Sequence, residues 1–106
     1  MIFRRSGRFD ELVRRQLDLF AEDEAELLDE AHDADDAWTH ADREEAEELY
    51  GDYQLVVDAI GEGLYETRET YAASLAGRAA DEYRAAFDRK ARKRFGRYAS
   101  FLQGEQ

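Results

Sequence analysis

Two histidines and two carboxylates stand at a regular spacing in the first half of the sequence. They are His32, Asp36, His40 and Glu44, each four residues after the last. On one continuous α-helix, residues four apart lie on the same face, so the four side chains would form a single row. Imidazole and carboxylate groups bind divalent transition metals. The row is therefore a candidate site for iron or manganese.

A shorter motif in the same stretch resembles the ligand pattern of a known class of metalloproteins. Asp29-x-x-His32 is similar to the Glu-x-x-His motif of the di-iron carboxylate bundles, which need two such motifs and further glutamates on facing helices. Here the first residue is Asp, and His40 has Ala37 three positions before it. The resemblance implies a metal-binding, ferritin-like helical protein, which is the alternative hypothesis for function.

The same stretch also holds the best candidate for a turn. Thr39 followed by Asp42 resembles a helix-capping box. Glu44 and Glu45 then lie early in the next helix, where the helix dipole favours negative charge. A turn within residues 34–40 divides the row of ligands and leaves both histidines beside an exposed turn.

No residue is assigned a catalytic role. Arg68-Glu69 resembles part of the substrate clamp of the small all-helical chorismate mutases, but that clamp also needs a cation late in the first helix and a lysine near the first turn. Both regions are acidic here. None of the serines has a histidine in a plausible triad context, and the absence of cysteine excludes thiol nucleophiles and zinc–thiolate sites. The sequence therefore favours a non-enzymatic protein.

The composition predicts an all-α fold in a single domain. Of the 106 residues, 43% are hydrophobic and 39% are charged, and there is no proline, a mixture typical of long amphipathic helices. No apolar run approaches the ~18–20 residues that span a bilayer, and the start lacks a signal-peptide pattern. We therefore expect no membrane association, and the absence of cysteine is compatible with a cytoplasmic protein.

Apolar residues recur every three or four positions, which is the period of one helix face. The pattern predicts three helices, at about 8–36, 40–75 and 78–102, after a basic N-terminal tail at 1–8. The middle segment has a coiled-coil-like seam. Short connections make neighbours antiparallel, which gives an antiparallel three-helix bundle, or a long helical hairpin with a third helix beside it. A first helix that continues to Tyr50 is the rival interpretation.

Glycines interrupt the middle segment at Gly51, Gly61 and Gly63. Each costs ~1 kcal/mol relative to alanine in a helix interior, so a compensating reason is expected. One explanation is the close approach of another helix, and the other is a kink or π-bulge at residues 60–64. Gly77 is expected at the left-handed position that ends this helix.

Negative charge is concentrated around the first turn. The chain has 26 acidic and 15 basic residues, a net charge of −11. Residues 21–48 hold 14 of the acids and a single base, whereas residues 78–97 are net positive. The overall charge repels phosphate backbones, so nucleic acid is not an expected partner. The basic run at 89–94 is expected to pair with acids of its own or another subunit.

In an up-down-up arrangement the third helix ends opposite about residue 52, so residues 25–52 should project as an uncovered hairpin tip. A two-helix hairpin buries little apolar surface alone, and a second copy of the chain, in a dimer, would cover it. The acidity of the tip predicts a basic protein partner, although it also suits a salt-rich cytoplasm. The predicted partner-binding residues are Trp38, Glu44, Glu45, Glu47, Glu48, Tyr50 and Tyr53. The sequence thus predicts a helical interaction and oligomerisation module.

Overall fold

The protein is helical throughout residues 7–99, the part of the chain that the computed structural model describes. Its elements are α1 (Asp10–Asp23), α2 (Ala25–Thr39), α3 (Arg43–Ala72), α4 (Gly77–Phe95) and a 3-10 turn, η1 (Gly96–Ala99). The predicted all-α class is confirmed, and no strand occurs in this range. None of the described helices is long and apolar enough to cross a membrane.

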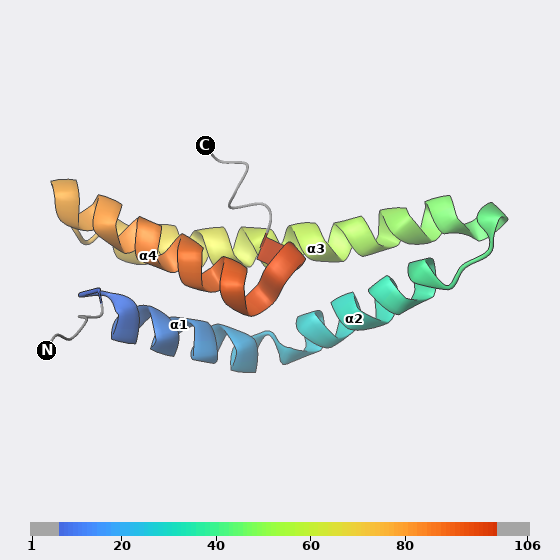
Figure 1. The fold of residues 1–106 in the computed structure, drawn as a ribbon, viewed down its shortest axis with the longest axis horizontal. Helices are drawn as coiled ribbons and strands as arrows, with labels where there is room; N and C mark the ends of the chain where they lie inside the picture. The colour runs from blue at the N-terminus through green and yellow to red at the C-terminus, as the bar shows by residue number, and fades with distance from the viewer. Residues whose placement is uncertain (1–6, 100–106) are drawn as a thin grey trace, which may run out of the picture.

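The prediction of one helix over 8–36 is wrong, because the chain bends at Glu24. This residue has φ −108° and ψ 29°, outside the helical range, and separates α1 from α2. Its N–H donates to the carbonyl of Phe20 at 2.8 Å, and its own carbonyl accepts from Leu28 at 2.9 Å. The hydrogen bonds on both sides are kept, so α1 and α2 follow one another along one edge of the molecule (Figure 1).

The chain first reverses at residues 40–42, later than the predicted turn at 34–40. Helix α2 includes Thr39, so the expected cap at that residue is wrong. Asp42 is the N-cap of α3, and its Oδ1 accepts a hydrogen bond from the N–H of Glu45 at 3.1 Å. A carboxylate at this position also complements the positive end of the helix dipole. The rival interpretation, a first helix that continues to Tyr50, is wrong as well.

Helix α3 is a continuous α-helix over 30 residues, so the π-bulge considered at 60–64 does not occur. Close helix approach explains Gly63, because a Cβ there would lie 3.0 Å from Cε1 of Phe20 in α1. Gly61 is buried. Gly51 has no atom within 4 Å of the place a Cβ would take, so close approach does not account for that residue.

Two glycines with positive φ stand at the two ends of α4. Gly77 has φ 54°, as expected for a left-handed residue, but it begins α4, and Ala73 is the C-cap of α3. Gly96 has φ 58° and ends α4 well before the predicted residue 102. Residues 100–102 of that predicted helix, and residues 1–6 of the predicted basic tail, lie outside the described residues.

The core lies where α4 packs against both α1 and α3. Its largest fully buried side chains are Tyr83, Phe87, Leu17, Ile60, Leu64 and Val13. At the other end of the molecule α2 packs along the first half of α3. The result is an elongated molecule of 55 × 32 × 26 Å in which α4 covers only one half of α3 (Figure 1).

Candidate interaction surface

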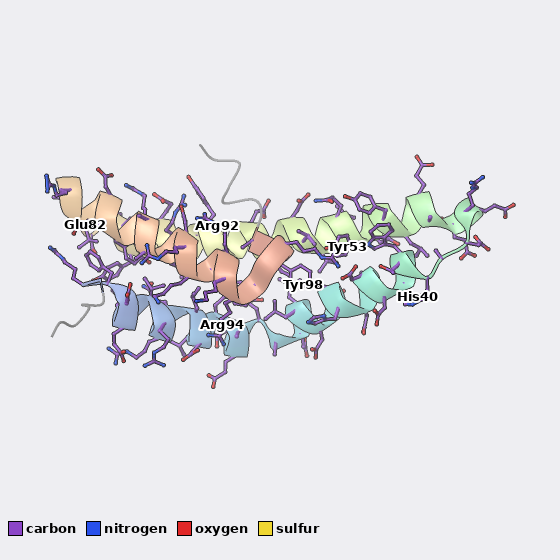
Figure 2. The ribbon with its side chains drawn as sticks, in the orientation of Figure 1. His40, Tyr53, Glu82, Arg92, Arg94 and Tyr98 are labelled. Carbon is purple, nitrogen blue, oxygen red and sulfur yellow. The ribbon has the colours of Figure 1, made fainter. Side chains whose placement is uncertain are left out.

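Helix α2 and the start of α3 form a two-helix arm that extends past α4 (Figure 1). We define the arm as residues 25–52 and the body as the other described residues. Tyr98 of η1 marks their boundary, since its ring centroid lies 6.4 Å from that of Tyr53 and 5.6 Å from that of His32. The side chains of Tyr53 and Tyr98 meet at the end of α4 in Figure 2. This register agrees with the prediction that the third helix ends opposite about residue 52.

Trp38, Tyr50 and Tyr53 form one aromatic cluster between α2 and α3, with Tyr53 at the border between arm and body. The ring centroids of Trp38 and Tyr50 are 4.9 Å apart, and Tyr53 lies 6.2 Å from Trp38 and 5.9 Å from Tyr50. Tyr53 is buried, Trp38 is partly buried, and Tyr50 is 44% exposed. The structure therefore brings the three predicted aromatic residues together, and Tyr50 is the one that a partner can reach.

The indole N–H of Trp38 is buried and has no acceptor among the described residues. A buried donor without an acceptor costs about 1–3 kcal/mol. Burial also raises the pKa of Tyr53, the deepest ring of the cluster. The aromatic cluster thus contains a buried hydrogen-bond donor that could find an acceptor if the arm rearranged.

The predicted acidic residues lie on the first turns of α3. Glu44, Glu45, Glu47 and Glu48 are all exposed, and none forms an ion pair within residues 7–99. Only one carboxylate of the arm pairs with a base in this range, since Asp35 accepts a hydrogen bond from Arg97 of η1. The arm therefore keeps most of its negative charge uncompensated.

Carboxylates of the body are paired far more often. The body carboxylates paired with a base on another element or connection are those of Arg8–Glu82, Arg68–Asp88, Arg84–Glu69, Arg89–Asp10 and Arg94–Asp18. The hydrogen bond from Arg94 lowers the pKa of Asp18. The prediction that the basic run at 89–94 pairs within the chain is confirmed for its first and last arginines.

The row of histidines and carboxylates does not assemble a metal site within the described chain. The turn at 40–42 places Glu44 on α3, whereas His32 and Asp36 lie on α2 and His40 is the C-cap residue of α2. Nδ1 of His32 lies 3.4 Å from the hydroxyl of Tyr98, and Nδ1 of His40 lies 3.0 Å from the carbonyl oxygen of Asp36. No three histidine, aspartate or glutamate side chains in the described part of the chain are grouped so that they could hold an ion. The predicted iron or manganese site therefore does not form from these residues in a single chain.

A buried charged network, which the sequence analysis missed, joins α3 to α4. Arg68 is only 4% exposed, and it donates to Oδ1 of Asp88 at 2.7 Å and to Oε2 of Glu69 at 2.8 Å. Glu69 also accepts two hydrogen bonds of 3.0 Å from Arg84 of α4. These bonds lower the pKa of Glu69 and raise the pKa of Arg84. The network fixes the pairing of the two helices.

The position of Arg68 also argues against a substrate clamp like that of the chorismate mutases. Its guanidinium is buried against two carboxylates of the chain, which leaves it no access to a dicarboxylate substrate. A sequence signal for this burial exists, because Arg68 lies midway between Leu64 and Ala72 on the apolar row of α3. A charged residue inside an apolar row predicts a buried ion pair.

Comparison with protein family models, curated proteins and solved structures gives no match. The function is therefore inferred from the surfaces of this chain. Among them, the arm combines carboxylates that mostly lack an ion pair in the described range, an exposed tyrosine ring and a stretch of two helices that α4 does not cover.

Proposed function

We propose that the protein is a non-enzymatic helical interaction module whose arm binds a basic partner. The observation that carries this proposal is the uneven pairing of charge. The glutamates at 44, 45, 47 and 48 have no ion pair within residues 7–99, whereas carboxylates of the body such as Asp18 and Asp88 are paired. A surface built only for solubility gives no reason for this separation.

The arm offers both components of a recognition surface. Its clustered carboxylates produce a local negative potential, which accelerates the approach of a positively charged surface and selects against acidic ones. Beside them, Tyr50 and Trp38 supply aromatic side chains of the kind that anchor protein interfaces. The carboxylates would therefore steer the partner, and the aromatic cluster would hold it.

Self-association belongs to the same proposal. The first half of α3 lacks the third helix that covers its second half (Figure 1), and a second copy of the chain can supply that cover in a dimer. In such a dimer, we expect each chain to form the antiparallel three-helix bundle with coiled-coil-like packing that the sequence predicts. A cytoplasmic location and the absence of nucleic-acid and membrane partners stay predictions from the composition.

The test replaces Glu44, Glu45, Glu47 and Glu48 with glutamine. The probe is a synthetic peptide rich in lysine and arginine, titrated by calorimetry at several NaCl concentrations. The quadruple variant should bind it about tenfold more weakly or worse, and the slope of log affinity against log salt should become shallower.

The matched control neutralises four exposed carboxylates of the body. These are Glu11, Glu62, Glu66 and Asp81. Both quadruple variants change the net charge equally, so a binding site on the arm predicts a much smaller loss in the control. Equal losses would show that net charge alone attracts the peptide, and the proposal would fail.

A further inference from the structure

Helix α4 lies over one side of α3 and stops at the arm, although the row of α3 that faces it continues. Arg68 defines that row, because it binds Asp88 of α4. At three- and four-residue spacing the row runs towards the start of α3 through Tyr65, Gly61, Val57, Gln54, Tyr50 and Glu47. The last two members, Tyr50 and Glu47, lie in the arm, beyond the contact between Tyr98 of η1 and Tyr53. The place that α4 would take over the arm is therefore empty of other described helices.

The α2 side of this uncovered face is acidic as well. His32 and Asp35 meet η1 through Tyr98 and Arg97 respectively. Asp36, four residues after His32, continues the same face of α2, is exposed and has no ion pair within residues 7–99. The uncovered face thus presents Asp36 from α2 together with the exposed ring and Glu47 of the α3 row.

The outer face of α4 carries the opposite charge. Figure 2 shows Arg92 and Arg94 on opposite edges of α4, with Arg94 directed towards α1, where it pairs with Asp18. Arg92 and its neighbour Lys93 form no ion pair within residues 7–99. Ala85 lies two helical turns before Arg92 on the same face and is exposed, so a second helix can approach closely there.

We propose that the basic partner of the arm is α4 of a second copy, so that two copies pair antiparallel and each α4 covers the arm of the other. This inference rests on the proposed function and names the partner of the same surface. The two α4 helices would lie end to end in one layer between the two copies. The last ten residues of α4, 86–95, span about 15 Å, which is enough to cover residues 43–52 of α3.

The pairing places unlike charges opposite one another. Arg92 and Lys93 of one copy come to lie near Asp36 and Glu47 of the other, and two-fold symmetry forms every contact twice. The same cover removes the exposed ring of Tyr50 from water, which adds a contribution that salt does not screen. Each chain has a net charge of −11, and salt near physiological ionic strength weakens that long-range repulsion more than the short-range pairs.

The experiment is a charge exchange between two variants of the full chain. The arm variant carries Asp36→Lys and Glu47→Lys, and the α4 variant carries Arg92→Glu and Lys93→Glu. Sedimentation velocity should give the wild type at twice the mass of one chain. Each variant alone faces like charges in both contacts and should dimerise at least tenfold more weakly, whereas an equimolar mixture should restore the dimer.

A matched control carries Glu26→Lys and Glu30→Lys. Glu30 is two residues from His32, so it lies about 200° away around α2 and does not face the proposed partner. This control should dimerise like the wild type. Circular dichroism of every variant shows that its helices are intact, and a variant that fails this check is replaced by the milder Lys93→Gln or Glu47→Gln.

Three results would overturn the inference. They are a wild type that stays monomeric, a dimer that survives both reversals, and a mixture that does not recover. The proposed function fails in a different way. A monomeric chain that still binds the basic peptide through its four glutamates refutes only the second copy, whereas a charge-exchanged dimer with no selective peptide binding refutes only the separate basic partner.

Discussion

The ring of Tyr98, in the turn that follows α4, lies 6.4 Å from the ring of Tyr53 in the first half of α3. The neighbouring Arg97 reinforces this contact, because its guanidinium lies 5.7 Å from the same ring and it pairs with Asp35 of α2. Three helices are thus tied together at one level of the molecule. Beyond that level only α2 and α3 remain, so the two ends of the chain should differ in stability and in response to salt.

Replacing Asp88 with alanine should lower the free energy of unfolding by about 2–4 kcal/mol. Removing one partner of a buried ion pair leaves the other charge uncompensated, and Glu69 offsets only part of that loss for Arg68. Urea unfolding measures the change. Asp81→Ala is the control, because Asp81 is an exposed partner of Arg84 at 3.7 Å and its loss should cost less than about 0.5 kcal/mol. Equal losses in the two variants would contradict a structural role for the network.

Tyr83 should make the protein less stable in alkali. Burial raises the pKa of Tyr83 to about 12, even though its hydroxyl donates to Gln16 at 2.7 Å. The unfolded chain has a tyrosine pKa of about 10, so the folded-state value is the higher one. Stability is therefore complete below about pH 10 and falls as the pH rises to about 12, by no more than about 3 kcal/mol for this group.

Tyr83→Phe should remove that part of the pH dependence. Urea unfolding of both proteins between about pH 9 and pH 12 gives the comparison. The difference in unfolding free energy between them should shrink as the pH rises, because the variant has no hydroxyl to ionise. Two parallel curves would show that Tyr83 ionises as easily in the folded protein as in the unfolded chain.

Two glycines of α3 should respond in opposite directions to alanine. Gly51→Ala should stabilise the protein by about 0.5–1 kcal/mol, since the added methyl group meets no atom within 4 Å and alanine is the better helix former. Gly63→Ala should be at least about 1 kcal/mol less favourable, because its methyl group would lie 3.0 Å from the ring of Phe20. Thermal unfolding of the pair measures this difference. Equal gains would mean that the ring moves aside freely.

Helical periodicity identified most of the fold but not its boundaries. The buried rows, such as Val13–Leu17–Phe20 in α1, follow the period that one packed face imposes. The bend at Glu24 gives no local signal, because it depends on how α1 packs on α4 and α2 packs on α3. Gly96 is a local signal for the end of α4, but the apolar period continues past it to Tyr98 and hides it.

The candidate site shows the same division between local pattern and distant contact. The sequence placed Trp38 and the two tyrosines on one surface at the hairpin tip, because both helices bring them near one turn. The predicted turn lies several residues before the observed one. The candidate metal ligands would form a row only if the helix continued without a turn. Arg68 was missed because its partner Asp88 lies on another helix, and only the tertiary structure shows that pairing.

Amide hydrogens of the arm should exchange faster than those of the body at low salt, and should slow as NaCl is added. The arm has only two helices and leaves the indole N–H of Trp38 without a described acceptor. The carboxylates on its surface, most of which have no ion pair in the described chain, repel one another, and salt screens that repulsion. Hydrogen exchange followed by mass spectrometry, from about 0.05 M to about 1 M NaCl, measures residues 26–52 against residues 60–72.

The body segment is the internal control, because α4 packs against it and its Arg68 and Glu69 are ion-paired. Its exchange should change little with salt, since screening weakens ion pairs such as Arg84–Glu69 instead of relieving repulsion. Selective slowing of the arm means that unpaired charge strains this region, as expected of a surface kept for a partner. Uniform slowing of both segments would instead mean that salt acts on the whole acidic molecule, as expected of adaptation to a salt-rich cytoplasm.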